Sequence, residues 1–122
     1  MPERQPLIAS FGHAVSGLAA LVRRERNARI HLAATVLVVA SAATLRLPVH
    51  DLRWLILAIA LVWIAEAMNT AIEGLADIVS ADRSPEMGRV KDIAAGGVLV
   101  ASVAAAAIGG TIFLPYLCDW AR

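Results

Sequence analysis

The chain has 122 residues, of which 59% are hydrophobic and 17% are charged, with a formal net charge of +1. Its mean hydropathy of +0.69 excludes an ordinary water-soluble domain of this length. Cys118 is the single cysteine, so an intrachain disulfide and a paired-thiol metal site are excluded as well. The composition therefore predicts one membrane-embedded domain over residues 1–122. No nucleic acid is expected among its partners.

Residues 1–29 are expected to form an amphipathic helix. Pro2 and Pro6 indicate a frayed start, and from Leu7 onward apolar residues recur at helical spacing until a charged cluster at residues 23–26. A helix with this pattern lies in the plane of the membrane interface, with its apolar face against the acyl chains. An ordinary soluble helix is the alternative, which the apolar remainder of the chain disfavours.

Three longer apolar segments follow, at about residues 30–47, 52–80 and 90–116. Pro48 ends the first segment, and the polar residues 81–89, with their Pro and Gly, predict a loop before the third. Each segment is long enough to cross a bilayer as a helix. The predicted fold is therefore an all-α membrane protein with three transmembrane helices and an N-terminal interfacial helix.

Basic residues predict the orientation, because cytoplasmic flanks of membrane spans carry an excess of Lys and Arg. Those on one expected side are Arg4, Arg23, Arg24, Arg26, Arg29, Arg83, Arg89 and Lys91. Those on the other side are Arg46, Arg53 and Arg122. The N-terminus and the loop before the third span are thus expected in the cytoplasm.

A row of polar side chains continues the second span without any helix-breaking residue. With ~3.6 residues per turn, the row shares one arc of about 80° on the helix surface. Its members are Glu66, Asn69, Glu73 and Asp77. Carboxylates at membrane depth are costly, and by default they mark a functional site that faces the interior of a bundle.

The acidic residues near the water boundary offer hard oxygen ligands, which Mg²⁺ takes together with substrate phosphates. They are Glu25, Glu73, Asp77 and Asp92. Lys91 lies beside them as a point charge for phosphate. Glu66, deeper and less solvated, could accept a proton from a lipid hydroxyl. These parts suit phosphoryl transfer from a magnesium nucleotide to a lipid alcohol, although the sequence has no Walker or protein-kinase motif.

Two sequence blocks closely resemble those of the small bacterial integral-membrane diacylglycerol kinases and undecaprenol kinases. The first is EAMNTAIE at residues 66–73, followed by Asp77, and the second is GRVKDIAA at residues 88–95. The block ERNARIH at residues 25–31 fits the same family, and it is more similar to the undecaprenol branch. The resemblance extends over almost the whole chain, from about residue 11 to residue 114.

The resemblance implies a homotrimer in the cytoplasmic (inner) membrane of a bacterium, with each site shared between neighbouring subunits. It implies that the enzyme uses Mg²⁺ and ATP to phosphorylate undecaprenol or diacylglycerol. Glu66 falls at the catalytic base, and Glu25 and Glu73 fall at the acidic pair that holds magnesium and nucleotide phosphates. The other matching active-site or nucleotide positions are Asn69, Asp77, Asp82, Arg83, Ser84, Lys91 and Asp92.

Other polar residues are weaker candidates. Asn27 and Arg29 could contact a lipid headgroup or merely bilayer phosphates, and His31 could bind lipid or act as an interfacial anchor. His13 stands where the diacylglycerol enzyme of enteric bacteria has an aromatic residue, which weakens the case for nucleotide stacking there.

Two other functions remain open from the sequence. Glu66 and Asp77 could form the proton relay of a small proton- or ion-coupled transport protein. A structural membrane subunit could pack through surfaces such as Gly96-Gly97 and Gly109-Gly110. Only the kinase requires magnesium-ATP, so nucleotide binding separates these functions.

Overall fold

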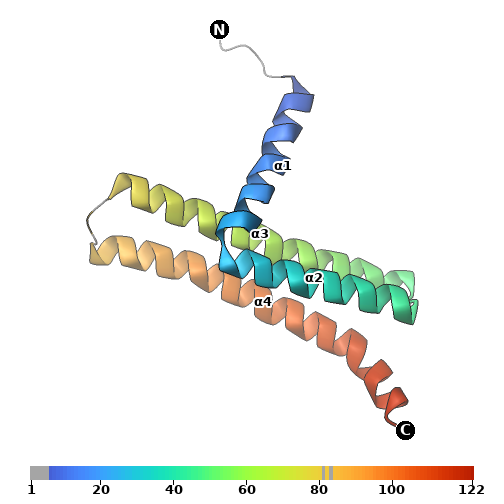
Figure 1. The fold of residues 1–122 in the computed structure, drawn as a ribbon. Helices are drawn as coiled ribbons and strands as arrows, with labels where there is room; N and C mark the ends of the chain where they lie inside the picture. Colours follow the sequence, from blue (N-terminus) through green and yellow to red (C-terminus); the bar gives the residue numbers. More distant parts are fainter. Residues whose placement is uncertain (1–5, 81, 83) are drawn as a thin grey trace.

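The computed structural model describes residues 6–80, 82 and 84–122. Over these residues the chain forms four helices (Figure 1), namely α1 (Leu7–Arg24), α2 (Arg26–Leu45), α3 (Val49–Val79) and α4 (Pro85–Trp120). The predicted all-α architecture is confirmed, and α2, α3 and α4 are each long and apolar enough to cross a membrane.

The helices α3 and α4 form a long antiparallel pair, and α2 lies against the half of this pair that is nearer the start of α3 (Figure 1). A buried cluster joins the three helices near the α2–α3 turn and is built from Ala42, Leu47, Leu55 and Ile112. Large apolar side chains cover much of the outer surface. An apolar exterior of this kind suits contact with lipid or with other membrane helices.

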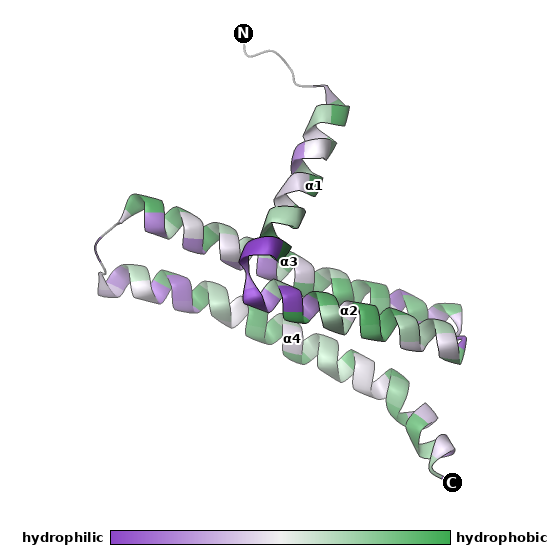
Figure 2. Cartoon of the chain, in the orientation of Figure 1, coloured by the Kyte–Doolittle hydropathy of each residue, from purple (hydrophilic) through white to green (hydrophobic). Residues whose placement is uncertain are grey.

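The helix lengths place the ends of α3 and α4 outside the hydrocarbon core. At ~1.5 Å per residue, α2 is about 30 Å long, α3 about 46 Å and α4 about 54 Å, against about 30 Å of hydrocarbon. Hydrophilic residues gather at the α1–α2 junction and along the parts of α3 and α4 that extend beyond α2 (Figure 2). The polar row of α3 therefore runs from the membrane span toward water.

The expected helix over residues 1–29 is interrupted at Glu25. This residue has extended backbone angles (φ −100°, ψ 125°) and caps both the end of α1 and the start of α2. The membrane helix α2 consequently begins at Arg26 rather than near residue 30, and α1 leaves the bundle at a steep angle (Figure 1). Helical periodicity continues through Glu25 in the sequence, which is why the break was not predicted.

The ends of the other spans also differ from the expected ones. The α2 helix ends at Leu45 because Arg46 takes a left-handed conformation (φ 51°), and α3 begins at Val49, directly after Pro48. The α4 helix starts at Pro85, so the predicted loop over 81–89 is too long. Ser84 accepts a hydrogen bond from the Met87 amide (3.1 Å), which caps this start.

At its other end α4 continues to Trp120, although the expected limit was residue 116. Pro115 lies inside this last part, where it removes one helical hydrogen bond and crowds the preceding turn. The helix bends away from α3 toward its C-terminus (Figure 1), as a helix does at an internal proline.

Candidate active site

The polar row on α3 passes from a buried to an exposed environment. Glu66 is 1% exposed and Asn69 is 8% exposed, and no other polar side chain in the described part of the chain is as buried. Glu73 is half-buried and Asp77 is exposed. The Asn69 Nδ2 group donates a hydrogen bond to Glu73 Oε1 (3.2 Å), so these two residues share one face as the spacing predicts.

The deep end of the row is closed by α2. His31 Nε2 lies 3.6 Å from Glu66 Oε2. One helical turn further along, Trp63 Nε1 donates a hydrogen bond to Thr35 Oγ1 (3.0 Å), and Thr35 Oγ1 donates to the His31 carbonyl (2.7 Å). The sequence had placed His31 at the lipid or as an interfacial anchor, whereas the structure places it beside Glu66.

Two further carboxylates, those of Glu25 and Glu73, belong to the water-facing side of the predicted site. Glu25 lies at the α1–α2 junction and Glu73 lies two turns beyond Glu66 on α3, and both are half-buried. Like charges are tolerated together in a partly buried site when a cation or a proton compensates them.

The donor atoms fit Mg²⁺ bound together with phosphates better than a metal held by the protein alone. Glu66 Oε2 and Asn69 Oδ1 are buried and lack a hydrogen-bond partner among the described residues. Within residues 6–80, 82 and 84–122 no three His, Cys, Asp or Glu side chains gather into a metal-binding group. Mg²⁺ needs only one or two carboxylates when phosphate and water oxygens complete its shell. Glu25 and Glu73 are the residues expected from the sequence to supply these carboxylates.

At the exposed end of the row, the structure brings together two of the predicted nucleotide-binding residues. Lys91 on α4 donates a hydrogen bond to Asp77 Oδ1 on α3. Both side chains are more than a third exposed, so the pair is weak and can rearrange when a phosphate approaches. Asp92, the next residue on α4, is also exposed.

The remaining predicted nucleotide residues lie between α3 and α4. Asp82 is exposed, and its carbonyl accepts a hydrogen bond from Ser80 Oγ (2.7 Å). Ser84 is half-buried and caps α4, which gives its hydroxyl a structural role. Arg83 lies outside the described residues.

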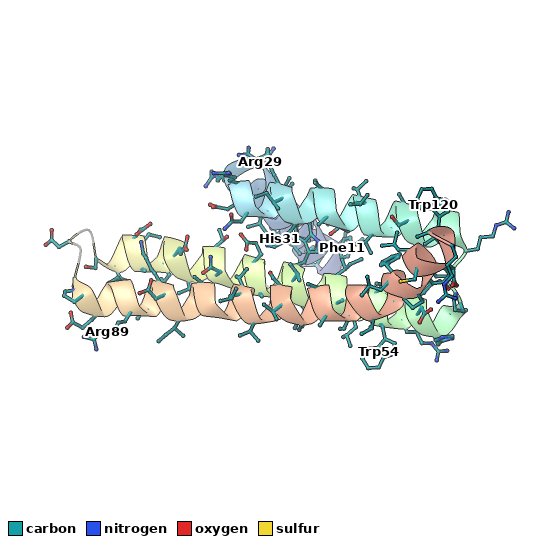
Figure 3. The ribbon with its side chains drawn as sticks, turned by 90° about the horizontal axis from the view of Figure 1, so that it is seen from below. Phe11, Arg29, His31, Trp54, Arg89 and Trp120 are labelled. Atoms are coloured by element: carbon teal, nitrogen blue, oxygen red, sulfur yellow. The ribbon has the colours of Figure 1, made fainter. Side chains whose placement is uncertain are left out.

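His31 lines two grooves. One, of about 310 Å³, lies between α2 and α4 and is lined by Asn27 and His31 among others. The second, of about 290 Å³, is almost wholly apolar and runs from His31 along α2, α3 and α4 as far as Phe113. Arg29, by contrast, lies on the side of α2 that faces away from α3 (Figure 3). Asn27 and His31 thus line a groove between α2 and α4.

Sequence reasoning missed Thr35, which links α2 to α3 beside the site. A signal for it was present, because Thr35 follows His31 by four residues and therefore lies on the same helix face. Trp63 precedes Glu66 by three residues on α3 in the same way. The sequence did not show that this face of α2 packs against this face of α3.

These features define a small helical membrane protein with a buried carboxylate at the end of a span and a charged cluster beyond it. The sequence profile of prokaryotic diacylglycerol kinase matches residues 12–113. A diacylglycerol kinase of Synechocystis sp. is 38% identical over 112 residues, which cover 91% of this chain and 64% of that protein. An undecaprenol kinase of Bacillus subtilis is 36% identical over 108 residues, which cover 88% of each protein.

The chain belongs to the prokaryotic diacylglycerol kinase and undecaprenol kinase family, a family of membrane lipid kinases. This finding confirms the resemblance drawn from the motifs at residues 66–73 and 88–95. The chain spans less than two thirds of the length of its Synechocystis relative, and most of its Bacillus relative.

Proposed function

We propose that this protein transfers the γ-phosphoryl group of ATP to the hydroxyl of a membrane lipid, either undecaprenol or diacylglycerol. The reaction takes place at the cytoplasmic surface of the inner membrane, on the side that holds the N-terminus and the α3–α4 connection. One observation carries the proposal. Among the described residues the most buried carboxylate, that of Glu66, lies on the long apolar helix α3 beside His31 of α2.

In the proposed reaction the lipid hydroxyl oxygen attacks the γ-phosphorus of ATP. A new P–O bond forms to the lipid, the bond between the γ-phosphorus and the bridging oxygen breaks, and ADP leaves with that oxygen. The hydroxyl proton passes to Glu66, which acts as general base. Because Glu66 is buried and its neighbour His31 lines the apolar groove, a hydroxyl presented beside His31 would meet little competition from water.

The outer residues hold the nucleotide. Glu25 and Glu73 are the proposed magnesium ligands, and Asn69 orients Glu73 through its hydrogen bond. Bound Mg²⁺ supplies positive charge that offsets the charge on the transferred phosphoryl group. Lys91 is free to exchange Asp77 for phosphate, since their pair is exposed to solvent. Asp82, Arg83, Ser84 and Asp92 are proposed as further nucleotide contacts.

We further propose that the active unit is a homotrimer with sites shared between subunits. One chain surrounds the polar row incompletely, because α2 covers only its deep end and the described residues of one chain form no three-ligand metal group. The outer faces carry large apolar and small residues suited to helix contacts. Mass measurement of the purified protein in detergent tests this, and a stable, fully active monomer would refute it.

Both undecaprenol and diacylglycerol are compatible with these observations as the lipid substrate. One relative is called a diacylglycerol kinase and the other an undecaprenol kinase, at nearly equal identity. The block at residues 25–31 favours undecaprenol. The apolar groove has few polar groups with which to distinguish one lipid chain from another.

The test is an assay of the purified protein with radiolabelled ATP, Mg²⁺ and either lipid in mixed micelles. We expect label in the lipid phosphate, dependent on Mg²⁺. Absence of both lipid labelling and magnesium-ATP binding would contradict the kinase and would favour a proton- or ion-coupled transporter, or a structural subunit. Comparing turnover on the two lipids identifies the preferred alcohol.

A further inference from the structure

The Glu66 carboxylate has a buried oxygen that lacks a hydrogen-bond donor among the described residues. Glu66 Oε2 is buried and accepts no hydrogen bond from them. The nearest cationic or potentially cationic side chain is that of His31, with Nε2 at 3.6 Å. An unpaired carboxylate oxygen in a buried, low-dielectric site is costly, so a donor at this point stabilises it.

The position of His31 is determined by contacts around it. Trp63 Nε1 donates to Thr35 Oγ1 across the α2–α3 interface, and the Thr35 hydroxyl donates to the His31 carbonyl. Trp63 precedes Glu66 by nearly one turn, and Thr35 follows His31 by about one turn. The two antiparallel helices thus meet at two successive levels. The Trp63–Thr35 bond sets the register that brings His31 opposite Glu66.

The distance between Nε2 and Oε2 is longer than a hydrogen bond, which joins N and O atoms at 2.7–3.2 Å. Contacts of this kind in substrate-free enzymes are often long and shorten in the reactive complex. The His31 side chain is 19% exposed, which leaves its ring room to move by a few tenths of an ångström.

We infer that His31 is the positioning residue of Glu66, donating its Nε2–H to Oε2 so that Oε1 is directed at the lipid hydroxyl. This inference rests on the proposed kinase function, in which Glu66 is the base. The other groups that face Glu66 are the carboxylates of Glu25 and Glu73, which repel it. His31 is therefore the neighbour that holds the carboxylate in place, and it is not primarily a headgroup contact.

A double-mutant cycle tests this role. We expect His31→Ala to lower kcat by about 10²-fold, the cost of misplacing a reacting group by about 1 Å, with an unchanged KM for ATP. His31→Gln keeps an amide donor and should recover part of the loss. In a Glu66→Gln background, His31→Ala should cause no further loss, because its effect passes through Glu66. His50→Gln, at the opposite end of α3, is the matched control with parent activity.

A second measurement does not depend on activity. In ¹⁵N-histidine NMR spectra, the Nε2 resonance that disappears in His31→Gln belongs to His31, and it should shift in Glu66→Gln. The His50 resonance should stay in place, because its carboxylate neighbour is Asp51 (3.4 Å).

The outcomes separate the two claims. Parent activity in His31→Ala, losses that add in the double mutant, or an unmoved His31 resonance in Glu66→Gln would each refute the role of His31 while leaving the kinase intact. Absence of lipid phosphorylation by the parent protein would instead refute the proposed function, and the role of His31 in it.

Discussion

The two halves of the polar row on α3 lie in contrasting surroundings although they belong to one continuous helix. Around Glu66, α2 packs against α3, the carboxylate is buried, and a histidine and a tryptophan–threonine hydrogen bond lie next to it. Around Asp77, three turns further along, α2 is absent, and the side chain pairs with Lys91 of α4 in solvent. Burial thus separates a group suited to proton transfer from groups suited to binding charge.

This contrast suggests a division of work along one helix. The buried half can exclude water from a hydroxyl and a carboxylate, which a proton-transfer step requires. The exposed half can admit a charged nucleotide without the high cost of desolvating it. Substitutions in the buried half should therefore change kcat, whereas substitutions in the exposed half should change the affinity for nucleotide and magnesium. The expected effects are given from the largest to the smallest.

The largest effect is expected for Glu66→Gln. Glutamine keeps the volume and the hydrogen-bonding capacity of the side chain but cannot take up the proton. Since general-base catalysis contributes ~10²–10⁴-fold, kcat for lipid phosphorylation should fall by about that factor while nucleotide affinity is kept. Turnover near that of the parent at saturating substrates would show that the deep carboxylate is structural.

Substitution of the proposed metal ligands should act on the magnesium requirement. Glu73→Gln and Glu25→Gln each remove a charge while keeping the shape of the side chain. Loss of a residue that only hydrogen-bonds to a metal ligand typically costs ~10–100-fold in metal affinity or activity. Loss of a ligand itself should therefore raise the Mg²⁺ concentration for half-maximal activity by at least about 10-fold. Titration of activity against Mg²⁺ measures this. Parent-like curves for both variants would withdraw the assignment.

A smaller effect is expected at the exposed end of the row. Lys91→Met should raise KM for ATP by about 10-fold, which corresponds to the ~1.5 kcal/mol of a hydrogen bond to a charged group, with little change in kcat. Asp77→Asn releases Lys91 from its partner and serves as the comparison. Steady-state kinetics at varied ATP distinguish the two parameters, and an effect of Lys91→Met on kcat alone would contradict the division of work.

The smallest effect concerns the α2–α3 contact itself. Thr35→Val removes the acceptor of the Trp63 hydrogen bond, and in membrane proteins such bonds contribute ~0.6 kcal/mol on average. We expect a slightly lower unfolding temperature in detergent. Thr44→Val is the matched control, because the Thr44 hydroxyl bonds only to its own helix, at the Ala40 carbonyl (2.8 Å). Equal unfolding temperatures for the two variants would show that this contact is not needed to dock α2.

The sequence by itself determined the features that depend on local periodicity and composition. Three spans follow from long apolar segments, and the shared face of Asn69 and Glu73 follows from the geometry of a single helix. The motifs at residues 66–73 and 88–95 identified the family, which the comparisons confirm. The assignment of individual site residues to magnesium, nucleotide and lipid stays a prediction.

Only the tertiary structure decided which helix faces meet. His31 and Glu66 are 35 residues apart in the sequence, and Thr35 and Trp63 are 28 apart, so no local rule pairs them. The break at Glu25 and the start of α4 at Pro85 were likewise set by the turning of the chain and by a cap rather than by hydropathy. Packing between helices fixes their register, and that register places a histidine beside the buried carboxylate.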